Sequence, residues 1–198
     1  MWAGYQNKLP ANQRQDLLGQ TADNLLILGA GSFGQVIREI AEAMDCFGEI
    51  IFLDDDPELG SGPLADYKKL RSKFRYAYAA FGKNDLRSKW MNHLKAAGYD
   101  LPTLIHPTAV ISPSAILGQG VSVLPKACIH TNARIGAGSI IGLGVLIDHD
   151  VLMGNYSLIQ TGSVVAAHST LPAFMSTKPG AVIKEPVHLD EFVFEVGV

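Results

Sequence analysis

The chain lacks the features that mark secreted, membrane-bound or nucleic-acid-binding proteins. It has two cysteines, Cys46 and Cys128, which lie far apart and form no C-x-x-C pair, so we expect reduced thiols rather than a disulfide. Its formal net charge of -3 offers neither a basic footprint for nucleic acid nor a polybasic membrane anchor. Residues 1–23, which we take as an N-terminal extension, have no apolar stretch typical of a signal peptide or membrane span. A cytoplasmic protein is therefore expected.

An aliphatic residue recurs at every sixth position in the second half of the chain. The series is Ile105, Ile111, Leu117, Val123, Ile129, Ile135, Ile141, Ile147, Met153, Ile159, Val165 and Leu171. A small residue or a valine stands four positions after most of them. No helix has a period of six, so the pattern predicts a solenoid, which we interpret as a hexapeptide-repeat parallel β-helix over residues 104–188. That fold is used mostly by acyl- and nucleotidyltransferases.

The residues before the repeat predict a small Rossmann-like α/β domain over residues 24–103. Two continuous apolar runs, 25–28 and 50–53, are typical of strands buried on both faces. A glycine-rich turn and a helix lie between them, which predicts a right-handed βαβ unit. The expected helices cover 35–46, 66–72 and 85–97, and a third strand covers 76–81. Gly98 and Pro102 end the last helix, so the seam between the domains falls near 100–103.

The turn Gly29-Ala30-Gly31-Ser32-Phe33-Gly34 is a candidate phosphate-binding loop. A lone G-x-G-x-x-G pattern is weak evidence, but this one follows a predicted strand and opens a predicted helix. The first glycine permits the tight turn, the second lets a phosphate approach the backbone, and the third lets helix and strand pack closely. The helix N-terminus then offers N–H groups to an anion. The alternative is a glycine turn that only closes the domain.

Asp54 and Asp55 follow the second apolar run and are candidates to contact a nucleoside. Asp54 lies about 20 to 25 residues after the glycines, the spacing at which an acidic residue holds a ribose in dinucleotide-binding folds. The domain is roughly half the length of a dinucleotide fold, and no second mononucleotide half follows it. A nucleotide-linked sugar therefore fits this domain better than NAD.

Several motifs occur in a specific order: the glycine turn, residues 52–56, residues 82–87, residues 105–111 and the repeats through 148–150. In this order the chain resembles the bacterial sugar acetyltransferases that include sialic acid O-acetyltransferase and the UDP-4-amino-sugar N-acetyltransferases. The resemblance covers about residues 25–171. It implies an N-terminal domain that binds a nucleotide-linked sugar and a left-handed β-helix that forms a homotrimer. It also implies acetyl-CoA as the acyl donor, bound between subunits, and transfer to a sugar amine or hydroxyl.

In that family a histidine on the β-helix is the general base, and His149 stands at the matching position. An imidazole accepts, at neutral pH, the proton that an amine or hydroxyl loses as it attacks a thioester. A carboxylate must hold the ring in one tautomer, and we favour Asp150 over Asp148 for this role. The alternative is a solvated turn histidine whose flanking aspartates only keep the surface soluble.

The chain departs from the family pattern at two positions expected to contact acetyl-CoA. Leu158 stands where members often have a second histidine, and Ala167 where they often have a glycine. The backbone N–H of Ala167 still offers an oxyanion donor. The repeats also fade after Leu171, and a short tail, residues 189–198, ends the chain. The alternative function is therefore a non-catalytic, nucleotide-sugar-binding trimer with a shortened CoA groove.

No metal site is expected. His130, His149 and His168 are spaced by 19 residues, close to the 18 residues of a three-hexapeptide coil, which places them on adjacent coils along a diagonal. The sequence shows no carboxylate or cysteine framework that closes a site around this line of imidazoles.

Overall fold

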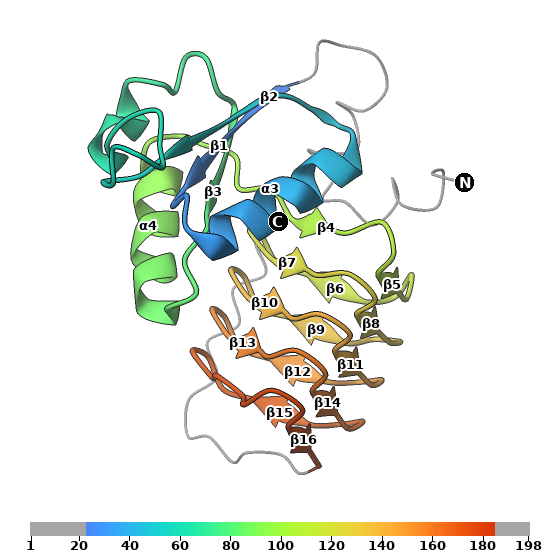
Figure 1. Cartoon of the computed structure of the whole chain (residues 1–198). Coiled ribbons are helices and arrows are strands. Elements are labelled where there is room, and N and C mark those ends of the chain that lie inside the picture. The colour runs from blue at the N-terminus through green and yellow to red at the C-terminus, as the bar shows by residue number, and fades with distance from the viewer. Residues whose placement is uncertain (1–22, 185–198) are drawn as a thin grey trace. The chain divides into compact units, whose positions relative to one another are not determined.

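The computed structural model describes residues 23–184, which form two compact units (Figure 1). Within the described residues, the first unit comprises 23–81 and 89–102, and the second comprises 82–88 and 103–184. Residues 1–22 of the predicted extension (1–23), the last residues of the predicted β-helix (185–188) and the whole predicted tail (189–198) lie outside the described part, and Asp23 begins the first strand. No helix in residues 23–184 is long and apolar enough to cross a lipid bilayer.

The first unit contains a three-stranded parallel sheet in the order β2-β1-β3. The central strand β1 (Asp23–Leu28) pairs with β2 (Phe47–Leu53) on one edge and with β3 (Tyr76–Ala79) on the other. Residues 25–28 are fully buried, as their continuous apolar run predicts. Helix α3 (Ser32–Met44) connects β1 to β2, and Ile37 and Ile40 on its apolar face are buried.

The boundaries of five predicted elements differ from the prediction. Strand β3 ends at Ala79 rather than at residue 81, and helix α4 (Asn84–Ala96) lies one residue earlier than expected. Helix α3 begins at Ser32 rather than at residue 35, because it starts directly from the glycine turn with an extended Gly31 as its N-cap. The expected helix over 66–72 is a short 3-10 helix, η2 (Leu64–Lys68), whose first N–H is held by the carboxylate of Asp55 at 3.0 Å. Strand β2 begins three residues early, at Phe47. Local hydrogen bonds set these ends, and hydrophobic patterns do not record them.

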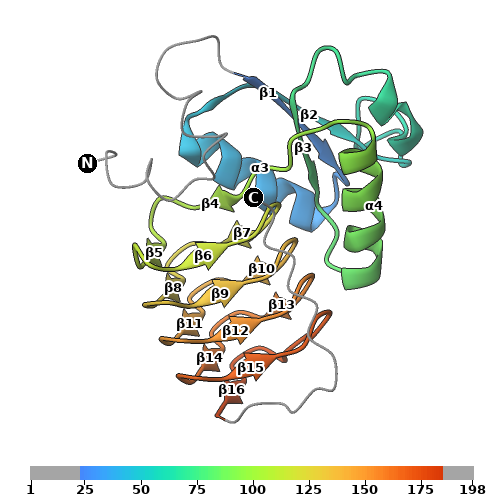
Figure 2. The same cartoon turned by 180° about the vertical axis from the view of Figure 1, so that it is seen from behind.

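The second unit is a parallel β-helix, as the hexapeptide period predicts (Figures 1 and 2). Its strands form three parallel sheets: a first face of β4, β7, β10 and β13, a second face of β5, β8, β11, β14 and β16, and a third face of β6, β9, β12 and β15. Their bounds are Leu104–Ile105 (β4), Val110–Ile111 (β5), Ile116–Leu117 (β6), Ser122–Val123 (β7), Cys128–Ile129 (β8), Arg134–Ile135 (β9), Ile140–Ile141 (β10), Leu146–Ile147 (β11), Leu152–Met153 (β12), Leu158–Ile159 (β13), Val164–Val165 (β14), Thr170–Leu171 (β15) and Val182–Ile183 (β16).

Each repeat places the same two residues in the core of the β-helix. The aliphatic residue at every sixth position from Ile105 to Leu171 is buried, apart from a partly exposed Leu117. The small residue or valine four positions later is also buried throughout the series from Ala127 to Ser169. Each buried aliphatic side chain contributes about 1.5–3 kcal/mol, so the period itself accounts for much of the unit's stability.

The turns of the β-helix share a conformational requirement that the hydrophobic period does not reveal. One residue in each repeat, every sixth from Gly120 to Gly180, has a positive φ angle. The N–H of this residue donates to the preceding coil, from Asp150 to the carbonyl oxygen of Thr131 at 2.9 Å and from His168 to that of His149 at 3.1 Å. Equivalent turn residues therefore lie in columns, spaced by 18 residues along the chain.

At the corner between the third and first faces, the chain covers its own turns. We call this the clamped corner; its column of turn residues contains Gly138, Tyr156 and Phe174. The guanidinium group of Arg87, which is fully buried, donates to the carbonyl oxygens of Gly138 at 2.6 Å and Tyr156 at 2.9 Å. Asn84 Nδ2 donates to the carbonyl oxygen of Phe174 at 2.8 Å. Residues 82–88 thus join three consecutive coils.

The β-helix continues past the last regular repeat. Strand β16 pairs with β14, and an isolated bridge joins Ser176 to Leu158. Main-chain hydrogen bonds hold these additional segments, for example from the N–H of Leu158 to the carbonyl oxygen of Met175 at 2.7 Å. Because the ladder uses backbone groups, it persists where the aliphatic period fades after Leu171.

Candidate active site

The corner between the second and third faces carries most of the ionisable groups of the β-helix turns. We call it the histidine corner, made of turns 130–133, 148–151 and 166–169 on three successive coils. Its column of positive-φ residues is Asn132, Asp150 and His168, with φ angles of 58°, 57° and 63°. Asparagine, aspartate and histidine are the non-glycine residues that tolerate this conformation best. The fold therefore admits polar side chains at the positions where it needs a left-handed turn.

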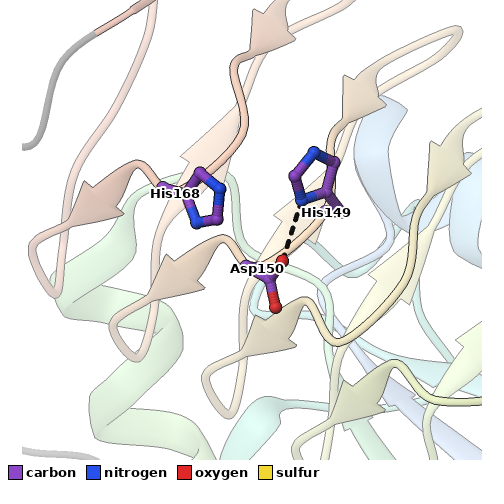
Figure 3. A group of neighbouring side chains, drawn as sticks. All are labelled: His149, Asp150 and His168. Carbon is purple, nitrogen blue, oxygen red and sulfur yellow. Dashed lines mark hydrogen bonds and ion pairs between the residues drawn. The ribbon is translucent and has the colours of Figure 1, made fainter.

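His149 and Asp150 form a hydrogen-bonded pair in the turn between β11 and β12 (Figure 3). The distance from His149 Nδ1 to Asp150 Oδ2 is 2.8 Å, and the two side chains are 41% and 40% exposed. In the tautomer that donates its Nδ1 proton to the carboxylate, Nε2 keeps its lone pair and can accept a proton. This is the geometry that a general base requires.

Asp148 has a different function in the same turn. Its Oδ1 accepts a hydrogen bond from the backbone N–H of His149 at 2.7 Å and lies 3.9 Å from His130 Nδ1. The carboxylate therefore fixes the backbone of the turn, while Asp150 contacts the ring of His149. Of the two aspartates weighed from the sequence, the structure places Asp150 on the imidazole.

Asn132 holds the second oxygen of the Asp150 carboxylate. Its Nδ2 donates to Asp150 Oδ1 at 3.1 Å, while Oδ2 is engaged with His149. An Asn132–Asp150–His149 chain thus fixes the carboxylate plane and the ring together. The sequence analysis did not identify Asn132. Its spacing of 18 residues from Asp150, which is one full coil, is the signal that identifies it.

The hydrogen bond between the pair changes the acidity of both groups. Donation to Asp150 raises the pKa of His149 above its usual value, and the negative charges of Asp148 and Asp150 act in the same direction, while partial desolvation opposes them. The pKa of Asp150 is lowered by the hydrogen bonds from His149 and Asn132, and further by the charges of His149 and His168. Asp150 is therefore ionised near neutral pH, and His149 is a stronger base than an isolated imidazole.

His168 completes the group from the next coil. Its ring lies edge-on to that of His149, with 5.0 Å between ring centroids. Ligand-capable atoms of His149, Asp150 and His168 all lie within 4.8 Å of one another (Figure 3). The sequence placed His149 and His168 on adjacent coils and Asp150 beside His149, but it did not indicate that the Asp150 carboxylate also lies near His168. Asp150 provides that carboxylate, because residues 150 and 168 are equivalent positions one coil apart.

The two candidate acetyl-CoA contacts lie in different parts of the β-helix. Ala167 immediately precedes His168 in the histidine corner, and its N–H donates no hydrogen bond within the described residues, so it is available as an oxyanion donor. Leu158 lies in β13 on the first face, which is opposite this corner. Within one chain, the structure brings Ala167 to the His149–Asp150 pair but not Leu158.

The glycine turn of the first unit has the conformation that its pattern predicts. Gly29 has a φ angle of +96°, and its N–H donates to the carbonyl oxygen of Leu53 at 2.8 Å. A Cβ atom on Gly34 would lie 2.1 Å from the carbonyl oxygen of Gly29, so only glycine permits this close helix–strand contact. Gly31 and Ser32 are exposed at the N-terminus of α3, the kind of position at which backbone N–H groups can bind an anion.

Asp54 lies beside this turn, whereas Asp55 has a separate partner. Asp54 Oδ2 accepts the N–H of Ala30 at 2.7 Å, and its Oδ1 accepts the N–H of Asp56 at 2.9 Å. Asp55 Oδ1 accepts the N–H of Leu64, which lies at the start of η2. The structure therefore brings Asp54, but not the carboxylate of Asp55, to the glycine turn.

Comparisons with known proteins agree with both units. Residues 24–94 match the family model of the PglD N-terminal domain. The UDP-N-acetylbacillosamine N-acetyltransferase of Bacillus subtilis (strain 168) is 32% identical over 110 residues, which is 51% of this chain and 51% of the relative. This chain thus matches about half the length of that curated relative.

Two solved structures match over most of their length. The acetyltransferase domain of PglB from Neisseria gonorrhoeae FA1090 superposes with a TM-score of 0.75 at 29% identity, covering 83% of this chain and 93% of that one; it has also been solved with acetyl coenzyme A. PerB from Caulobacter crescentus, in complex with CoA and GDP-perosamine, gives a TM-score of 0.75 at 25% identity, covering 85% and 92%. The resemblance to bacterial sugar acetyltransferases of the hexapeptide-repeat type is confirmed. The predicted fold, a Rossmann-like domain followed by a parallel β-helix, is likewise confirmed.

Proposed function

We propose that this chain transfers an acetyl group from acetyl-CoA to the amine of a nucleotide-linked sugar. The observation that carries the proposal is the hydrogen-bonded His149–Asp150 pair in a turn of the β-helix, held from behind by Asn132. Its chemistry suits an acyl transfer that requires one proton acceptor and no covalent nucleophile. The relatives from Bacillus subtilis and Caulobacter crescentus are N-acetyltransferases, which favours an amine over a hydroxyl and an enzyme over a non-catalytic binding protein.

In the proposed reaction, the sugar nitrogen attacks the carbonyl carbon of the thioester while His149 Nε2 accepts the proton that the nitrogen loses. The resulting tetrahedral oxyanion is stabilised by backbone N–H groups, of which that of Ala167 is the candidate in this corner. The C–S bond then breaks, and the protonated imidazole returns its proton to the CoA sulfur. Throughout the cycle Asp150 stabilises the imidazolium without accepting its proton. The products are an N-acetylated sugar and CoA with a free thiol.

The predicted Rossmann-like domain, residues 24–103, is proposed to bind the nucleotide. Gly29, Gly31, Ser32 and Gly34 would hold its phosphates, and Asp54 and Asp55 its nucleoside end. The exposed N-terminus of α3 supports the phosphate assignment, since anions bind at such termini. Asp54 is the stronger candidate of the two aspartates, because its carboxylate already contacts the turn at Ala30.

The test of the catalytic proposal is thiol release with acetyl-CoA and a panel of UDP- and GDP-linked amino sugars. His149→Ala is expected to lower kcat by about 100-fold or more, the contribution typical of a general base. His106→Ala, a turn histidine at the start of the β-helix, serves as the matched control and should retain the wild-type rate. Added imidazole should restore part of the lost rate, because it replaces the missing proton acceptor. Undiminished turnover in His149→Ala would remove His149 from the mechanism.

We also propose a homotrimer, supported by an apolar strip on the second face. The outward-facing residues of its five strands are aliphatic or cysteine, spaced by 18 residues: Val110, Cys128, Leu146, Val164 and Val182. Three of them are strongly exposed in the described part of the chain, at 63% (Val110), 49% (Leu146) and 57% (Val182). This strip adjoins the histidine corner, so a second copy packed on it would lie beside the His149–Asp150 pair. Contacts between unlike surfaces give a closed ring when the rotation between neighbouring subunits closes, and a rotation of about 120° closes with three.

The oligomer is tested by light scattering coupled to size-exclusion chromatography. Leu146→Glu is expected to lower the measured mass from three chains toward one, because it places a charge in the apolar strip. Leu59→Glu changes a residue of similar exposure, 48%, in the first unit and should leave the mass unchanged. A cytoplasmic location is part of the same proposal, and the free state of Cys46 and Cys128 is consistent with a reducing compartment. A wild-type protein that elutes as a monomer would overturn the trimer.

A further inference from the structure

The histidine corner contains a donor set that the proposed acyl transfer does not need. Two imidazoles and one carboxylate, from His149, His168 and Asp150, present ligand-capable atoms within 4.8 Å of one another (Figure 3). General-base catalysis uses only the His149–Asp150 pair. A set of two imidazole nitrogens and one carboxylate oxygen is typical of sites for Zn²⁺ and neighbouring divalent transition metals.

The fold holds the three residues close together through the backbone. The N–H of His168 donates to the carbonyl oxygen of His149 at 3.1 Å, which fixes the distance between their coils. Asp150 and His168 occupy equivalent left-handed turn positions, so their side chains leave the corner in register. Asn132 binds Asp150 Oδ1, while Oδ2 contacts the imidazole of His149. The carboxylate is therefore already oriented before any ion arrives.

The distances allow an ion after small side-chain movements. Bonds of about 2.0–2.2 Å from zinc to nitrogen or oxygen place tetrahedral ligand atoms about 3.3–3.6 Å apart. The 2.8 Å contact between His149 Nδ1 and Asp150 Oδ2 must open slightly, and His168 must approach. His168 is exposed, so a rotation of its side chain meets no packed core. Three protein ligands leave one coordination position for water.

We propose that His149, Asp150 and His168 bind a divalent transition metal ion such as Zn²⁺, and that the bound ion blocks acetyl transfer. The second part of this proposal, the inhibition of acetyl transfer, rests on the proposed function. When the ion takes the Nδ1 lone pair, the remaining ring proton resides on Nε2, which then has no lone pair for a substrate proton. When it takes Nε2, that lone pair is consumed directly. Either binding mode removes the general base, and metal and substrate proton compete for one imidazole.

Other ionisable groups nearby do not belong to the set. His130 lies on the far side of His149, with 6.2 Å between ring centroids, and its Nδ1 is 3.9 Å from Asp148 Oδ1. Asp148 is engaged with the backbone N–H of His149. Because His130 is a histidine of the same corner that lies outside the donor set, it provides the matched control.

The binding test uses the full chain stripped of metal with a chelator, without substrates. Zinc chloride is titrated in competition with a fluorescent zinc indicator. We expect one ion per chain, and His168→Ala should weaken the apparent Kd by at least about tenfold, as expected when a ligand is lost. His130→Ala should stay within about threefold of wild type. Binding should also weaken as the pH falls, because protons compete for the imidazoles. Equal zinc affinity in His168→Ala and wild type, or equal weakening in His130→Ala, would overturn the site.

The inhibition test follows the loss of thioester absorbance, because thiol-detecting reagents and zinc interfere with each other. Zinc should inhibit the wild-type enzyme, and a chelator should restore its activity. His168→Ala should require at least about tenfold more zinc for the same degree of inhibition. His168-dependent zinc binding in a protein that acetylates no sugar would retain the metal site and reject the proposed function. An enzyme that acetylates a sugar but binds no zinc would retain the proposed function and reject the metal site. Zinc that binds through His168 without inhibiting would reject only the block on transfer.

Discussion

The clamped corner and the histidine corner are built from the same six-residue turn, yet they are used differently. At the clamped corner, the buried Arg87 and the side chain of Asn84 bind the turn carbonyls of three coils. At the histidine corner, equivalent positions carry the partly exposed Asp150 and the exposed His168. At the first corner, side chains from residues 82–88 cover the turns and bind their carbonyl oxygens. At the second corner, the turns carry titratable side chains that are exposed to solvent. In this β-helix, one column of turns is thus used for stability and another column carries the candidate catalytic groups.

The largest expected effect breaks the clamped corner. Arg87→Met should destabilise the second unit by roughly 3 kcal/mol, because it removes a buried charged donor from the carbonyl oxygens of Gly138 and Tyr156. Arg134→Met, at an exposed position on the third face, should change stability by less than about 0.5 kcal/mol. Urea denaturation measures both values. At temperatures where Arg87→Met is folded, the pH dependence of its turnover should match wild type. Equal stability of the two variants would show that the hydrogen bonds of Arg87 at the clamped corner do not stabilise the second unit.

The next effect alters the histidine corner without loss of the fold. Asp150→Asn should lower turnover by about tenfold or more, because the ring loses the carboxylate that orients it and stabilises its protonated form. Turnover requires neutral His149, so the rate falls as the pH drops through the pKa of that residue. Asp150 raises this pKa, and its removal should therefore move the acid limb to lower pH. The measurement is kcat/KM between about pH 5 and 8.

Asp148→Asn is the matched control for this shift. Its charge also raises the pKa of His149, but it does not bind the ring, so the acid limb should move in the same direction by a smaller amount. An acid limb that stays in place in Asp150→Asn, or one that moves further in Asp148→Asn, would contradict the assignment of Asp150 as the orienting group.

The smallest effects compare one asparagine from each corner. Asn84→Ala removes hydrogen bonds to backbone oxygens and should cost about 1 kcal/mol of stability with turnover unchanged. Asn132→Ala removes a hydrogen bond to Asp150 at an exposed position and should cost less than about 0.5 kcal/mol. Its effect should appear in turnover, as a decrease of about threefold or less, because the carboxylate loses one of its two supports. Urea denaturation and initial rates of both variants test whether Asn84 acts mainly on stability and Asn132 mainly on turnover.

Much of the fold could be predicted because short periods in a sequence report burial directly. The sixth-residue aliphatic series predicted the β-helix and its core, and the apolar runs at 25–28 and 50–53 predicted the buried strands. Ends of elements were predicted less well. Helix α3 starts three residues early and η2 replaces a longer helix, since caps such as the Asp55–Leu64 hydrogen bond fix those ends.

The candidate site was only partly predictable. His149 and Asp150 are neighbours in sequence, so their proximity followed from the chain itself. Asn132 and His168 reach Asp150 only because one coil contains 18 residues and every turn uses the same left-handed position. The hydrophobic period gives the length of the coil but not which turn residue takes the positive φ angle.

The sequence by itself determined the two kinds of unit, the residues of the β-helix core, the glycine turn and the histidine–aspartate pair. The tertiary structure decided which turns are covered and which are open. Arg87 lies 51 residues from Gly138 and 69 from Tyr156, and no local pattern announces that its guanidinium will be buried against their carbonyl oxygens. The same holds for the meeting of His149, Asp150 and His168. Hydrophobic periodicity records which side of the chain faces the core, whereas contacts between coils depend on the three-dimensional register of the turns.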